Sequence, residues 1–84
     1  MKLPIIKTLV SNDRLTEDHY KKASEVLQVL AQARGLKSEE LDVIGELVSN
    51  IEGALVVHDD HVHFGTPLKE ALNKFMQRVI KSVQ

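Results

Sequence analysis

Apolar residues recur every three or four positions along most of this chain, which is the spacing of amphipathic helices. The clearest pattern covers residues 41–57, where the apolar stripe comprises Leu41, Ile44, Val48, Ile51 and Leu55. Beside this stripe, three small residues stand four positions apart: Gly45, Ser49 and Gly53. Side chains four apart lie on one face of a helix, so these residues form a smooth strip. Because each glycine inside a helix costs about 1 kcal/mol relative to alanine, the strip indicates close packing.

Two helices are predicted before this segment. A short one has Pro4 in its first turn, where the missing N–H is not needed, and ends at the polar residues 11–13. A longer helix covers residues 17–34, with Thr16 as its N-cap and Gly35 as the left-handed residue after its end. Its apolar positions have amphipathic spacing: Tyr20, Ala23, Val26, Leu27, Leu30 and Ala33.

The helix that contains residues 41–57 has Ser38 as its predicted N-cap. Only residues 35–37 separate it from the preceding helix, and such a short connection predicts an antiparallel helical hairpin. Its C-terminal limit is open, since residues 56–64 fit either a continued helix or a small hairpin that turns at residues 59–60. Two aspartates without glycine make a poor two-residue turn, so we expect the helix to continue.

A last helix is predicted from Thr66-Pro67, an N-cap followed by proline, to about Ser82. Its apolar face comprises Leu68, Leu72, Phe75, Met76, Val79, Ile80 and Val83. Together these patterns predict an all-α fold: one helical domain over residues 1–84, with three principal helices preceded by a short N-terminal one.

Composition and charge narrow the class of protein. A chain of 84 residues has a small core and buries only about 60% of its unfolded surface. It has no cysteine, which excludes disulfides, thiolate metal sites and thiol catalysis. Basic and acidic residues number 11 and 12 and are mixed along the chain, so we expect no nucleic-acid or membrane partner. Lys7 interrupts the only apolar patch that resembles a signal peptide, which predicts a cytoplasmic protein.

One cluster has the character of metal ligands: His58, His61 and His63. Neutral imidazole suits zinc, nickel or copper. On a helix, however, His58 and His61 lie about 60° apart while His63 points nearly away from both, so the three converge only in a specific turn. The sequence contains no phosphate-binding glycine loop, nucleophile elbow or H-E-x-x-H pair. We therefore expect no catalysis and no cofactor, with metal binding by the three histidines as the alternative function.

The strip formed by Gly45, Ser49 and Gly53 allows two interpretations. It lets another helix of the same chain pack closely, or it forms a contact between two subunits. The first is favoured, because a small domain buries the apolar surface it has. A leucine at Gly45 or Gly53 would then disrupt folding, at a cost of about 1–3 kcal/mol from overpacking. A variant that stays folded but no longer self-associates would favour the second.

Three segments carry a resemblance to a known family: MKLPIIK at residues 1–7, EELDVIGELVSNIEGALVVH at residues 39–58 and KEALNKFMQRVI at residues 69–80. They resemble a family of small all-helical bacterial proteins described only as a domain of unknown function. Residues 59–64 lie outside these segments, which argues against a family-wide histidine site. The resemblance also implies a redox context beside thioredoxin-like proteins. Without cysteine, the chain would act there as a binding partner rather than a thiol catalyst.

These observations favour a non-catalytic interaction or accessory module. Its helices present more apolar surface than so small a chain easily buries. We expect it to self-associate, or to bind another protein, through an apolar helix face.

Overall fold

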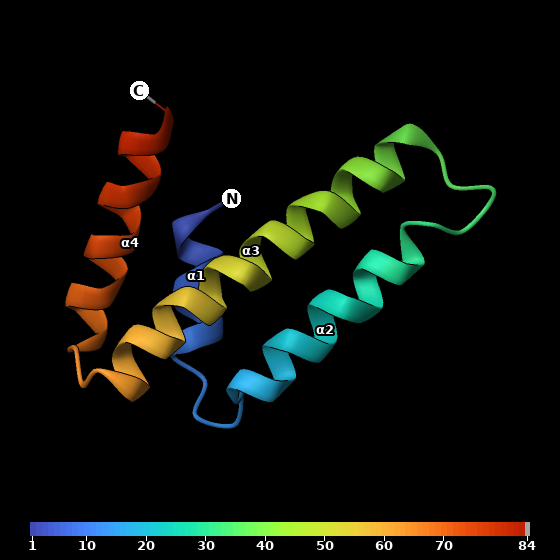
Figure 1. The fold of residues 1–84 in the computed structure, drawn as a ribbon. Coiled ribbons are helices and arrows are strands. Elements are labelled where there is room, and N and C mark those ends of the chain that lie inside the picture. Colours follow the sequence, from blue (N-terminus) through green and yellow to red (C-terminus); the bar gives the residue numbers. More distant parts are fainter. Residues whose placement is uncertain (84) are drawn as a thin grey trace.

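Four helices follow one another along the chain in the computed structural model, which describes the backbone of residues 1–83 and the side chains of residues 1–80 (Figure 1). They are α1 (Leu3–Val10), α2 (Glu17–Leu30), α3 (Ser38–His63) and α4 (Leu68–Val83). No strand occurs within the described residues, so the predicted all-α class is confirmed. The predicted apolar position at Val83 lies outside the described side chains. None of the described helices is both long enough and apolar enough to cross a bilayer.

Backbone N–H groups at the starts of α2 and α3 are satisfied by side chains one turn into each helix. Thr16 occupies the N-cap of α2 as predicted, and its N–H donates to Nδ1 of His19 at 3.0 Å. Lys37, rather than the predicted Ser38, occupies the N-cap of α3. Its N–H donates to the Glu40 carboxylate at 2.9 Å. A side chain at the third helical position thus caps each helix, as in one half of a capping box.

The hairpin of α2 and α3 is antiparallel, as the short connection predicts (Figure 1). However, α2 ends at Leu30 and not at Arg34. The N–H groups of Gln32 and Ala33 donate to carbonyls three residues earlier, both at 3.0 Å, so the chain tightens into turns before Gly35. Gly35 has a positive φ of 88°, which glycine adopts without steric cost, but it lies in the connection rather than directly after the helix.

Helix α3 is continuous through the segment for which a hairpin was the alternative. Its end is closed locally: the Thr66 hydroxyl donates to the Asp60 carboxylate at 2.8 Å, and the Thr66 N–H donates to the Asp60 carbonyl at 3.3 Å. Gly65 permits this reversal with a φ of 69°. Thr66 therefore serves the end of α3, and α4 begins at Leu68, two residues after the predicted N-cap.

The core lies along the C-terminal half of α3, which packs against the other three helices. Asn50, only 3% exposed, sets where this core begins. Its Oδ1 accepts the Lys2 N–H at 2.7 Å, which holds the start of α1 at this level of α3. All four helices contribute to the core: Ile6, Tyr20, Ala54, Val57, Ala71, Leu72 and Phe75. The N-terminal half of α3 extends beyond it, beside α2 (Figure 1).

The resulting molecule is flat. Its extents are 43 × 33 × 16 Å. The radius of gyration is 13.7 Å, whereas a compact domain of this length has about 12 Å. The cause is the projecting half of the α2–α3 hairpin, which no third helix covers.

Candidate functional site

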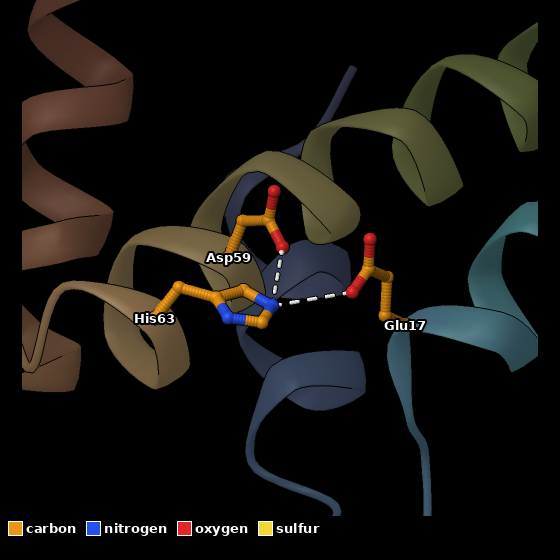
Figure 2. A group of neighbouring side chains, drawn as sticks. All are labelled: Glu17, Asp59 and His63. Atoms are coloured by element: carbon orange, nitrogen blue, oxygen red, sulfur yellow. Dashed lines mark hydrogen bonds and ion pairs between the residues drawn. The ribbon is translucent and has the colours of Figure 1, made fainter.

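The three histidines of the C-terminal part of α3 face different partners. The ring of His58 meets the ring of Tyr20 edge-on, with centroids 5.4 Å apart and an interplanar angle of 61°. Nδ1 of His61 donates to the Thr66 carbonyl at 2.7 Å, since a carbonyl can only accept. His63 turns toward the start of α2 instead (Figure 2). The structure therefore does not bring His58, His61 and His63 together as one set of ligands.

A different cluster forms around His63, between two carboxylates from two helices (Figure 2). Nε2 of His63 lies 3.2 Å from Oε2 of Glu17 and 3.3 Å from Oδ1 of Asp59. Asp59 is one turn earlier on α3, whereas Glu17 is the first residue of α2. The antiparallel hairpin places these two helix ends side by side. Glu17 was not among the predicted ligands, so this cluster was missed; the four-residue spacing of Asp59 and His63 was the signal available.

Electrostatics keep Glu17 ionised. Its pKa is lowered below the usual 4.5, first by the hydrogen bond from Lys21 and then by the one from His63. Nζ of Lys21 lies 2.8 Å from Oε1 of Glu17, and this contact raises the pKa of Lys21 in turn. Oδ1 of Asp59 is shielded from solvent and accepts no hydrogen bond from any described residue. An imidazole nitrogen between two carboxylates is chemically suited to hold a proton or a metal cation.

The strip of small residues on α3 meets different surroundings along its length. A Cβ atom at Gly53 would lie 2.8 Å from Cδ1 of Ile6 and 3.0 Å from Cζ of Phe75, so α1 and α4 side chains approach α3 closely there. A Cβ atom at Gly45 would meet nothing within 4 Å. Ser49, between them, is half-buried. Close packing within the chain thus occurs at Gly53, while Gly45 faces open space.

A second apolar surface lies on the projecting half of the hairpin. We call it the hairpin face and define it by four side chains with their exposed fractions: Val26 (65%), Leu30 (47%), Val43 (54%) and Leu47 (43%). Leu30 and Val43 lie across from each other on α2 and α3 and line a shallow hollow of about 410 Å³. Leu36 and Ile44 also line this hollow, and Glu39 and Glu40 stand beside them.

The hairpin face continues a stripe whose other half is buried. Val43 and Leu47 precede Asn50, Ala54 and Val57 at alternating spacings of four and three, which places all five on one side of α3. The last three are buried. Val43 and Leu47 lie before the level at which α1 begins, and they are exposed. The predicted apolar stripe from Leu41 to Leu55 does not include these five residues. This second stripe was therefore missed, although its spacing is visible in the sequence.

The sequence profile of DUF6952, which is described as a family of unknown function, matches residues 1–84. The chain belongs to this family. The DUF6952 match covers residues 59–64 as well as the three segments that carry the resemblance, so the resemblance extends over the whole chain. Comparison with curated proteins and with solved structures finds no match.

Proposed function

We propose that this protein is a non-catalytic interaction module whose hairpin face binds the same face of a second copy. The observation that carries the proposal is the exposure of Val26, Leu30, Val43 and Leu47 on a half-hairpin without a third helix, where Leu30 and Val43 line one hollow. Apolar side chains gathered on one surface are typical of protein–protein contacts.

The area that the molecule exposes supports association. A compact monomer of 9.4 kDa exposes about 5000 Å². This chain exposes 6135 Å². The excess is roughly 1100 Å², whereas each partner of a standard stable interface buries about 800 Å². Burying about 800 Å² of the projecting hairpin against one other molecule would therefore bring the exposed area to about 5300 Å², close to the value expected for its mass.

The shape of α3 favours a second copy as the occupant. Where α1 packs on it, the stripe carries Asn50, Ala54 and Val57 and is buried; before Asn50 it carries Val43 and Leu47 and is open. The open part thus has the same spacing as a surface already used for helix packing. A two-fold dimer places one patch against itself, and an apolar patch is chemically complementary to itself. The formal net charge of −1 adds little repulsion between two copies.

Size-exclusion chromatography with light scattering tests the proposal. The wild-type protein is expected to elute with about twice the mass of one chain at high micromolar concentration. Val43→Lys is expected to give a monomer that keeps its helical circular dichroism, because Val43 is 54% exposed and Glu39 stands four residues before it. Leu47→Lys is expected to have the same effect. With two variants, the test still stands if one of them fails to fold.

Val62→Lys is the matched control. Val62 is on the same helix, has the same residue type and is 55% exposed, but it lies at the other end of α3. This variant is expected to remain dimeric. A wild-type protein that is monomeric at high micromolar concentration overturns the proposal. So does a dimer that Val62→Lys weakens as much as Val43→Lys, because another surface would then hold the two copies together.

A further inference from the structure

Three side chains at the base of the α2–α3 hairpin, where α2 begins and α3 ends, bring possible metal ligands to one point (Figure 2). One nitrogen of His63 and one oxygen each of Glu17 and Asp59 lie within 4.8 Å of one another. The distances from the nitrogen to the two oxygens are 3.2 and 3.3 Å. Ligands bound to one ion at zinc-like bond lengths are separated by about 3.0 Å at right angles and about 3.4 Å in a tetrahedron. The separations from His63 therefore match those between ligands of a shared ion.

A hydrogen bond alone cannot satisfy this arrangement. Nε2 of His63 carries at most one hydrogen, and both neighbouring carboxylates are pure acceptors when ionised. The hydrogen bond goes to Glu17. Oδ1 of Asp59 is left without a donor among the described residues, although it is shielded from solvent. A carboxylate oxygen in such a position is costly unless a cation lies against it.

We propose that Glu17, Asp59 and His63 bind a divalent transition-metal ion such as Zn²⁺, with solvent completing its coordination. The ligands are Nε2 of His63, Oδ1 of Asp59 and Oε2 of Glu17. One imidazole and two carboxylates suit a borderline cation, and the two negative charges balance that of the ion. The side chains are 35–55% exposed, so the ion enters directly from solvent.

The surroundings of Glu17 support its role as a ligand. Its second oxygen, Oε1, accepts a hydrogen bond from Lys21 at 2.8 Å, which orients the carboxylate with Oε2 toward His63. Hydrogen bonds to the remaining oxygen of a ligating carboxylate are a common feature of metal sites. The ion would join the first residue of α2 to the last residue of α3. Binding would therefore hold the base of the hairpin closed and stabilise the folded chain.

Isothermal titration of the untagged full chain with zinc chloride tests the site. One Zn²⁺ per chain is expected to bind, and zinc is expected to raise the melting temperature. His63→Ala and Glu17→Gln are both expected to weaken binding at least about tenfold, since losing even an outer-shell partner of a metal site costs that much. Glu17→Gln keeps the shape of the side chain and should not disturb folding. It therefore tests the site even if His63→Ala unfolds.

His61→Ala is the matched control, because His61 is an exposed imidazole two residues earlier whose Nδ1 faces Thr66. It is expected to bind zinc like the wild type. Absence of zinc binding by the wild type overturns the proposal. Equal loss of zinc binding in His61→Ala and His63→Ala also overturns it, because zinc would then be bound by a set of histidines that includes His61. Val43→Lys should bind zinc whether or not the chain dimerises, so the two proposals fail separately.

Discussion

Substituting alanine for Gly53, with Gly45→Ala as the partner variant, measures how tightly α3 is packed at its two glycines. Both residues lie inside the same helix, so each substitution gains about 1 kcal/mol of helix propensity. At Gly45 a Cβ atom meets nothing within 4 Å. Gly45→Ala is therefore expected to raise the free energy of unfolding by about 1 kcal/mol.

At Gly53 the same Cβ atom meets the core. It would lie 2.8 Å from Cδ1 of Ile6 and 3.0 Å from Cζ of Phe75. Ile6 is 0% exposed and Phe75 is 7% exposed, so neither side chain has open space into which it can withdraw. Overpacking of this kind costs about 1–3 kcal/mol, which equals or exceeds the gain in propensity. Gly53→Ala is expected to lower the free energy of unfolding by up to about 2 kcal/mol.

Urea unfolding followed by circular dichroism gives the comparison, at equal protein concentration because association contributes to apparent stability. The propensity gain cancels between the variants, so their difference of about 1–3 kcal/mol reports overpacking alone. In a chain of this length, each 1 kcal/mol moves the melting temperature by about 4–8 °C. If Gly53→Ala stabilises the protein as much as Gly45→Ala, the close contact of α1 and α4 with α3 is refuted.

The remaining predictions concern two buried side chains, Tyr20 and Asn50. Tyr20, the only tyrosine, donates its hydroxyl to the Leu9 carbonyl at 3.1 Å, so Tyr20→Phe should lower the free energy of unfolding by about 1 kcal/mol in denaturant titrations. Burial raises the pKa of Tyr20 above 10.0. The unfolded chain therefore ionises at a lower pH than the folded chain, so the free energy of unfolding of the wild type should fall as pH rises through the folded pKa. Tyr20→Phe should show no such fall, and tyrosinate absorbance reports the ionisation in the wild type. Asn50→Ala removes the acceptor of the Lys2 N–H and should cost about 1–3 kcal/mol; an unchanged unfolding midpoint would show that this bond does not hold α1 in place.

Elements whose signals are local were predictable from the sequence. The apolar periodicity of α3, Pro4 in the first turn of α1 and Thr16 before α2 all act within one or two turns of a helix, and the structure has each of them. The end of α2 was wrong by four residues. Leu30 and Arg34 fit the helical pattern equally well, and only the turns that lead into Gly35 decide between them.

The candidate metal site was only partly predictable. The sequence drew attention to the histidine segment, because imidazoles and carboxylates are concentrated there. It could not indicate which histidine is used, since Glu17 lies 46 residues before His63 along the chain. That pairing depends on the rotation of α3 about its axis and on the length of both hairpin arms, and neither is set by local residues.

The sequence by itself determined the helices, their order and the antiparallel hairpin, because hydrophobic spacing, capping residues and short connections act locally. Tertiary structure decided which parts of α3 are covered. The core is built where α1 and α4 reach the helix, and α1 starts only at the level of Asn50, so the same apolar stripe is buried after that residue and exposed before it. Which glycine is packed and which surface is open follow from this single offset between helices.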